Sequence, residues 1–404
     1  MKKKLSLVLA TLMLLGLLAG CGGQPAASGD KDTVVVYIGD IFNSMTPYMT
    51  TANSDQAVFD QVYETLTVTK DDGTVAPCLA KSWKMSDDCL EYTFQLEEGV
   101  KFHNGEVMTA DDVVYSFEQY LANPAKNNFV SMIDKVEMVD ANTVKVTLNK
   151  ITPLFLVYIN ELPILNKKFV EEHNGNISDV ACGTGPYKLT SIDLATSAML
   201  ERNDDYRLAP AAIEKVELRY VGDRSTASVQ LETGDLDIMS IDPSQLVSFE
   251  NNDKFTVEKV QTLKTALLAI NTTVAPLDNK LVRQAMTYAV DKKSIITIAY
   301  ENCAVPARLQ ASDTNCFGVD FSDATDFSYN PEKAKELLAE AGYPNGLNFA
   351  DYGIQMDVLG GTYMEKAAQV MQQNFADVGI TIELRNTSTP DEDAESGNFA
   401  LMTQ

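Results

Sequence analysis

Several short segments of the chain alternate between apolar and polar residues, which is the pattern of a strand with one buried face. Residues 90–96 (LEYTFQL) carry a leucine or an aromatic residue at every second position. Because successive side chains on a strand point to opposite faces, this segment predicts a half-buried strand. Residues 144–148 (VKVTL), 216–220 (VELRY) and 380–384 (ITIEL) repeat the pattern. The continuous apolar run 34–38 (VVVYI) instead predicts a strand covered on both faces.

Apolar residues spaced three and four positions apart predict helices between these strands. One helix begins at Asn330-Pro331, where the asparagine caps the helix and the proline takes the first helical position, and it ends near Gly342. Because strands and helices alternate along the chain, the sequence predicts a mixed α/β fold. The other expected helices span residues 54–66, 278–289 and 362–378.

Residues 100–117 (VKFHNGEVMTADDVVYSF) contain His103, one of two histidines, and raise the question of a metal or acid–base site. Asn104-Gly105 is a strong turn signal. Thr109 and Asp112 have the spacing of a helix-capping box, and Asp111 also falls in the first turn, where the helix dipole favours negative charge. One histidine and two capping-region acids are too few ligands for a metal, so we interpret the segment as structural. The helix then carries an apolar stripe of Val113, Val114, Phe117, Tyr120 and Leu121.

No catalytic motif is found elsewhere. H-E-x-x-H and G-x-S-x-G are both absent. The one S-x-x-K, from Ser28 to Lys31, lies in a segment of small polar residues, and Gly183-Thr184-Gly185 lacks the Gly-Lys-Ser/Thr ending of a phosphate loop. We therefore expect no enzyme activity, no cofactor and no bound metal.

The six cysteines include no C-x-x-C pair, which argues against a zinc or redox site. Apart from Cys21 their number is odd, so at least one has no partner within the chain. Cys78–Cys89 and Cys303–Cys316 are close enough in sequence to be candidate disulfides, and the pairing among these four and Cys182 stays open.

The first residues have the form of an export signal. Lys2-Lys3-Lys4 precede an apolar run, 5–18, that is too short to cross a hydrocarbon core about 30 Å thick. The run ends in Leu18-Ala19-Gly20-Cys21, which resembles the lipobox of bacterial lipoproteins. This resemblance implies that residues 1–20 are removed and that Cys21 carries the lipid; the alternative is an ordinary signal peptide with a chance cysteine. Residues 22–32 are small and polar, and we expect residues 21–32 to form a flexible tether.

The chain is long enough for two or three domains and strongly acidic, with 404 residues and a formal net charge of −25. This charge argues against nucleic acid as a partner and keeps the body away from anionic lipid. Simple solubility explains the charge equally well.

Four blocks of the sequence resemble the extracytoplasmic solute-binding proteins, family 5, of peptide and nickel ABC transporters. The most specific runs from Leu79-Ala80-Lys81-Ser82-Trp83 through Tyr92-Thr93-Phe94 and the segment around His103 to Phe117. The other blocks are residues 183–189 (GTGPYKL), 269–272 (AINT) with 282–291 (VRQAMTYAVD), and 329–338 (YNPEKAKELL).

The resemblance implies an α/β, bilobed periplasmic-binding-protein-like fold with an extra inserted domain. Lobe I is expected to comprise residues 33–66 and 181–265, the inserted domain residues 67–180, and lobe III residues 266–404. Lobes of this kind close on a solute by a hinge and deliver it to an ABC permease in the membrane. Family members continue beyond the point where this chain ends, so we expect lobe III to be incomplete, with apolar surface left uncovered.

The resemblance also places the ligand-binding residues. For the glycines among them, the alternative is that they only shape the backbone. Met45-Thr46 departs from the Leu-Asp that is usual before Pro47, so the contacts of that loop stay open. The residues expected to bind the solute are Asn43, Ser44, Met45, Thr46, Gly183, Thr184, Gly185, Tyr187 and Asn271.

The leading hypothesis is a monomeric, lipid-anchored receptor for oligopeptides or dipeptides, on the outer face of the cell membrane or in the periplasm, that feeds an ABC importer. Nickel chelates or oligosaccharides are alternative solutes for the same fold. A secreted hydrolase is disfavoured by the missing catalytic motifs. A truncated product with impaired binding is the third alternative.

Overall fold

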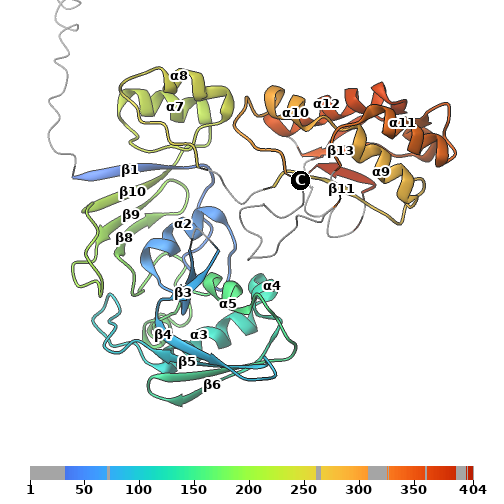
Figure 1. The fold of residues 1–404 in the computed structure, drawn as a ribbon. Coiled ribbons are helices and arrows are strands. Elements are labelled where there is room, and N and C mark those ends of the chain that lie inside the picture. The colour runs from blue at the N-terminus through green and yellow to red at the C-terminus, as the bar shows by residue number, and fades with distance from the viewer. Residues whose placement is uncertain are drawn as a thin grey trace, which may run out of the picture. The chain divides into compact units, whose positions relative to one another are not determined.

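The computed structural model describes residues 32–70, 73–260, 265–307, 325, 327–359, 362–387, 397 and 399–403. The chain divides into two compact units (Figure 1). Unit 1 comprises Met1–Val68 and Val75–Ser240, and unit 2 comprises Thr69–Thr74 and Ile241–Gln404. The predicted signal peptide, nearly all of the predicted tether and the predicted lipidation site Cys21 lie outside the described residues. The predicted boundaries of lobe I, the inserted domain and lobe III stay predictions.

The first sheet of unit 1 has the strand order β1-β10-β9-β8. β1 (Thr33–Ile38) runs parallel to β10 (Lys215–Tyr220), and Ile38 lies opposite Tyr220 at their carboxyl ends. The other neighbours in this sheet are antiparallel. The remaining strands are β9 (Ser197–Arg202) and β8 (Tyr187–Asp193).

β1 is covered on both faces, as its apolar run predicts. Val36 and Ile38 pack against the main core of the unit, which contains Phe59 of α2 (Asn53–Val62). Val35 and Tyr37 point the other way and form a second, smaller core with Ala227 of α7 (Arg224–Thr233). Because β1 lies between two cores, a polar side chain on either face would be buried. The sequence of this strand therefore does not alternate between apolar and polar residues.

The second sheet of unit 1 is antiparallel, with the order β4-β5-β7-β6 (Figure 1). Its alternating strand β5 buries Tyr92, Phe94 and Leu96, as predicted. α3 packs against this sheet. The strands are β4 (Ala80–Met85), β5 (Glu91–Leu96), β7 (Thr143–Leu148) and β6 (Ile133–Asp140); the helices nearby are α3 (Ala110–Ala122), α4 (Asn127–Val130), α5 (Phe155–Tyr158) and α6 (Lys167–Glu172), and β2 (Thr67–Thr69) pairs with β3 (Val75–Pro77).

Unit 2 has a four-stranded sheet of order β11-β16-β13-β15 and a two-stranded sheet of β12 and β14. Its core contains Met286, Phe349, Phe375 and Leu401. The strands are β11 (Leu268–Ile270), β16 (Leu401–Thr403), β13 (Met356–Leu359), β15 (Leu384–Thr387), β12 (Leu347–Asn348) and β14 (Ile380–Thr381); the helices are α8 (Leu246–Glu250), α9 (Lys280–Ala289), α10 (Lys292–Ile298), α11 (Pro331–Glu340) and α12 (Thr362–Asp377).

Three predicted elements are corrected by the structure. The helix expected at 54–66 ends at Val62, because Tyr63 takes an extended conformation and the β-branched residues that follow lead into β2. The strand expected at 380–384 is two strands, β14 and β15, which pair with different neighbours. Leu121, assigned to the buried stripe of α3, is 39% exposed.

One of the two disulfides considered from the sequence is not present in the structure. Cys78, Cys89, Cys182 and Cys303 carry free thiols, so the candidate disulfide between Cys78 and Cys89 is not formed. Cys316 lies outside the described residues. In that described part of the chain, no helix combines the length and apolar character needed to span a membrane.

Candidate functional site

An open hollow of about 480 Å³ lies in unit 1 where the parallel strands β1 and β10 end. In open α/β sheets, ligands bind outside the carboxyl ends of parallel strands, because loops and helix N-termini meet there. The hollow has this position: its wall includes Tyr220 at the end of β10 and the first turn of α2. The lining residues are Asp40, Ile41, Asn43, Thr51, Ala52, Asn53, Ser54 and Tyr220.

Asp55 fixes the loop that forms this hollow. Its side chain is fully buried in the first turn of α2. The carboxylate accepts hydrogen bonds from the backbone N–H of Asn43 at 2.7 Å, the N–H of Ser44 at 3.3 Å and the hydroxyl of Thr50 at 2.7 Å. The hydroxyl of Ser54 donates to the Ile41 carbonyl at 2.7 Å. The segment between β1 and α2 is therefore folded back onto the start of the helix.

Of the predicted loop residues, Asn43 lines the hollow. Met45 and Thr46 are buried within unit 1, and the N–H of Met45 donates to the Ser178 carbonyl at 2.9 Å. The Ser44 hydroxyl oxygen accepts from the N–H of Thr46 at 3.1 Å. Solute contacts by these four residues stay predictions, and the structure adds Asp55 as the residue that holds their loop.

The glycines of Gly183-Thr184-Gly185 pack against the other end of α2. The N–H of Gly185 donates to the Val62 carbonyl at 2.9 Å. A Cβ atom on Gly183 would lie 2.0 Å from that carbonyl oxygen, and one on Gly185 would lie 2.5 Å from the Gln61 oxygen. The close packing against α2 is therefore sufficient to explain why both positions are glycine.

The two neighbouring predicted residues are also buried. The Tyr187 hydroxyl donates to the Ile213 carbonyl at 2.9 Å. The Thr184 hydroxyl is buried and has no hydrogen-bond partner among the described residues. Solute binding by residues 183–187 stays a prediction.

His103 ties the glycine loop to the turn before α3. The backbone N–H of His103 donates to the Gly183 carbonyl at 2.9 Å, and the N–H of Gly183 lies 3.3 Å from His103 Nδ1. Nε2 lies 3.0 Å from the Gly185 carbonyl, which can only accept, so Nε2 carries the proton and Nδ1 accepts. The ring is neutral in this arrangement. Thr109 and Asp112 form the predicted capping box of α3.

Burial lowers the pKa of His103 to about 4, and Lys188 contributes in the same direction against the opposing Gly185 carbonyl and Glu64. Above pH 6.5 the ring is neutral in both folded and unfolded chains. As the pH falls from 6.5 towards 4, the unfolded chain takes up a proton that the folded chain refuses, so stability is lost in this window. Between pH 7 and pH 5 this loss should amount to about 1–2 kcal/mol in urea unfolding.

The His103→Gln variant keeps an N–H near Gly185 and cannot titrate, so its stability should fall less over the same window. His173→Gln, at the only other histidine, is the matched control for the loss of an imidazole. Equal pH dependence in all three proteins would contradict this account of His103.

Asn271 lies in unit 2, directly after β11. Its side-chain amide donates to the Phe399 carbonyl at 3.0 Å, and its backbone N–H donates to the Ala400 carbonyl at 2.9 Å. Its side-chain oxygen accepts from the N–H and the hydroxyl of Thr273 at 3.0 and 2.7 Å. Asn271 therefore fastens β11 to the segment before β16, and its predicted contact with the solute stays a prediction.

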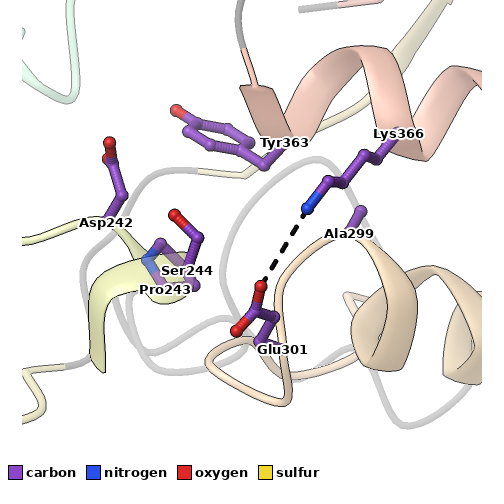
Figure 2. A pocket seen from close by; sticks show the side chains of 7 residues that line it. All are labelled: Asp242, Pro243, Ser244, Ala299, Glu301, Tyr363 and Lys366. Atoms are coloured by element: carbon purple, nitrogen blue, oxygen red, sulfur yellow. Dashed lines mark ion pairs between the residues drawn. The ribbon is translucent and has the colours of Figure 1, made fainter. Parts of the chain in front are cut away.

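A second, much smaller hollow lies in unit 2 (Figure 2). Tyr363 and Lys366 reach it from α12, and Lys366 Nζ lies 4.0 Å from a Glu301 carboxylate oxygen. Its volume of about 10 Å³ holds about one water molecule, which excludes it as the seat of a solute. Within the ranges that the structure describes, no three His, Cys, Asp or Glu side chains gather closely enough to hold a metal ion.

Residues 74–404 match the family model of the bacterial extracellular solute-binding proteins, family 5 Middle. This chain belongs to that family. A curated relative, heme-binding protein A of Haemophilus influenzae, is 30% identical over 423 aligned positions that cover 94% of this chain and 76% of the relative.

Two solved structures are similar to this family 5 protein in both sequence and fold. DppA from Helicobacter pylori, in complex with the peptide STSA, is 26% identical with a TM-score of 0.74, covering 92% of this chain and 77% of DppA. NikZ from Campylobacter jejuni, in complex with Ni(L-His), is 26% identical with a TM-score of 0.76, covering 93% and 77%. The predicted mixed α/β, bilobed periplasmic-binding-protein fold is confirmed. The family is extracytoplasmic, and its relatives bind solutes for ABC transport.

Proposed function

We propose that this family 5 protein is the lipid-anchored substrate-binding component of an ABC importer. It binds oligopeptides noncovalently and delivers them unchanged to a membrane permease. The observation that carries the proposal is the hollow at the carboxyl ends of β1 and β10, set between the loop held by Asp55 and the first turn of α2. The family supplies the transport context, and the DppA structure with a peptide supports this class of solute.

One further observation supports noncatalytic binding, and another supports the membrane anchor. Both ring nitrogens of His103 are engaged, Nδ1 with the Gly183 N–H and Nε2 with the Gly185 carbonyl, so this ring is not placed to act as a general base. The Leu-Ala-Gly-Cys sequence that ends at Cys21 supports the anchor. The mass of protein extracted from membranes tests it, because a lipidated Cys21 adds the mass of its acyl chains.

Binding is tested on the purified full-length protein with a mixed library of tri- to octapeptides. At a peptide concentration of about 100 Kd, binding adds about 2.7 kcal/mol of stability, which raises the Tm by several degrees. Mass spectrometry should recover the bound peptides intact. Asn43→Ala, in the wall of the hollow, should weaken binding about tenfold or more, because the polar solute loses a hydrogen-bond partner.

Asn142→Ala, in the turn before β7, is the matched control and should bind like the wild type. Absence of both heat and thermal shift would favour a product with impaired binding. Cleaved peptides would contradict the proposal outright.

A further inference from the structure

One loop of unit 1 exposes a run of apolar residues. Residues 208–213 (LAPAAI), between β9 and β10, contain no polar side chain. Leu208 is 57% exposed and Ile213 is 39% exposed, and of the residues between them only Ala211 is partly buried. Single exposed apolar residues are ordinary on a protein surface, but a consecutive run lowers solubility and usually has a function.

Hydrogen bonds hold the backbone of this loop, so the exposure of its side chains is built into the fold. The hydroxyl of Tyr187 donates to the Ile213 carbonyl at 2.9 Å, and Arg202 Nη1 donates to the Ala211 carbonyl at 3.3 Å. Arg207, directly before the loop, is held by its ion pair. A surface whose backbone is already held loses little conformational entropy when it binds.

The loop lies beside the point where the predicted tether enters unit 1. Lys215, the first residue of β10, pairs with Thr33, the first residue of β1. Ile213 precedes Lys215 by two residues, so its Cα lies within about 13 Å of that of Thr33. The predicted tether, residues 21–32, reaches roughly 20 Å as a coil. An anchor at Cys21 therefore keeps this edge of the sheet close to the bilayer.

The charges around the loop nearly cancel, unlike those of the chain as a whole. From position 201 to position 215 there are four acids and three bases, whereas the whole chain has a formal net charge of −25. The charged residues in this segment are Glu201, Arg202, Asp204, Asp205, Arg207, Glu214 and Lys215. Electrostatic repulsion therefore does not keep this edge of unit 1 away from a lipid surface without net charge.

The bilayer is the apolar phase within reach of the loop. Residues 22–32 contain no Val, Ile, Leu, Met or aromatic residue that could cover it. Entry of Leu208 and Ile213 into the bilayer removes apolar surface from water, which is favourable by about 25 cal/mol per Å². One loop cannot hold a protein on a membrane, since even a single acyl chain binds only marginally. Beside an anchor, the loop only has to orient a body that is already there.

We propose that residues 208–213 enter the headgroup region of the bilayer beside the lipid anchor and hold this edge of unit 1 against the membrane. This inference rests on the proposed anchor and adds a noncovalent contact with lipid. The hollow of unit 1 lies at the carboxyl ends of β1 and β10, whereas the loop lies at their amino ends. A body attached in this way directs the hollow away from the bilayer, towards solutes in the medium.

Fluorescence quenching by brominated lipid tests the contact. Leu208→Trp in a Trp83→Phe background carries its one tryptophan in the loop. The acylated protein is reconstituted in phosphatidylcholine vesicles, whose headgroups have no net charge, with or without bromine on the acyl chains. Bromine quenches tryptophan only at close range, so a side chain inserted by about 5–10 Å should lose about half of its emission. The same protein made without residues 1–20, and therefore without acyl chains, provides the unquenched reference.

Val139→Trp in the same background is the matched control. Val139 is 59% exposed, as Leu208 is to a similar degree, but it lies in β6 of the other sheet of unit 1. Its replacement should lose less than about a tenth of its emission, because β6 has no tether beside it. Since both positions are exposed, neither substitution should disturb the fold.

Equal quenching of the two variants, or no quenching of Leu208→Trp, would overturn the inference; the second result would leave a protein partner as the occupant of the loop. The mass of the membrane-extracted protein separates the two proposals. Acylated protein without quenching refutes the contact of the loop and leaves the anchor standing. Protein without acyl chains refutes the anchor, and this inference falls with it.

Discussion

Replacing Gly183 by alanine should lower the free energy of unfolding of unit 1 by at least about 3 kcal/mol. The new Cβ would lie 2.0 Å from the Val62 carbonyl oxygen and 2.8 Å from Cδ1 of Tyr63. The backbone cannot move aside cheaply, because the same Val62 oxygen accepts from Gly185 and both backbone groups of Gly183 bond to His103. The φ angle of Gly183 lies outside the left-handed region, so the cost comes from the collision alone.

The measurement is urea unfolding followed by the fluorescence of Trp83, the one tryptophan of the chain, which lies in β4 and therefore reports on unit 1. Gly175→Ala is the control within the same unit. Its φ is +77° with no atom within 4 Å of the added Cβ, so it should cost only the left-handed penalty of about 1–2 kcal/mol. A Gly183→Ala variant no less stable than Gly175→Ala would contradict the packing role.

The roles of Gly183 and Gly185 could not be predicted from the sequence. Both glycines lie in a segment that resembles a ligand-binding block of the family. Nothing in the spacing of that segment indicates a contact with Val62, which lies about 120 residues earlier in the chain. Only the folded chain reveals that they brace the end of α2. Local patterns, in contrast, predicted the capping box at Thr109, the N-cap at Asn330 and the strand β1 with two covered faces, because each depends on neighbours in sequence.

The hollow was only partly predictable for the same reason. Asn43 was expected to contact the solute, and it lines the wall. Asp55 was missed, because an acid in the first turn of a helix is ordinarily explained by the helix dipole, and its bonds to Asn43 and Thr50 require the loop to fold back. Tyr220 reaches the wall only through the parallel pairing of β10 with β1. Such pairings between distant segments leave no local pattern.

Replacing Glu64 by alanine should cost about 3–5 kcal/mol, because it leaves a partly buried guanidinium without its counterion. The Glu64 side chain is 7% exposed and that of Arg207 is 22% exposed, with Arg207 Nη2 at 2.7 Å from Oε1. Arg207 Nε lies 3.2 and 3.3 Å from the two carboxylate oxygens, and the Tyr206 hydroxyl donates to Oε1 at 3.0 Å. These three donors, and with them the Cys78 thiol, therefore lose their acceptor at once.

Cys78 belongs to the same cluster. Its Sγ lies 3.6 Å from Glu64 Oε1 and 3.6 Å from Arg207 Nη2. Burial, followed by the Glu64 carboxylate, raises the pKa of the thiol to about 11, so it stays protonated and donates to Glu64 at neutral pH. The cluster thus joins the residues after α2, the turn between β3 and β4 and the loop after β9, three segments that a single substitution would loosen together.

A double-mutant cycle measured by Trp83 fluorescence in urea isolates the pair. The Glu64→Ala/Arg207→Ala protein should be more stable than the sum of the single losses predicts, by at least about 1 kcal/mol, because it contains no unpaired buried charge. Glu98→Ala is the control: Glu98 is 69% exposed in its pair with Lys81, and its loss should cost about 0.5 kcal/mol or less. Additive single losses, or a Glu64→Ala cost no larger than that of Glu98→Ala, would show that the three segments are held by their apolar packing and not by this carboxylate.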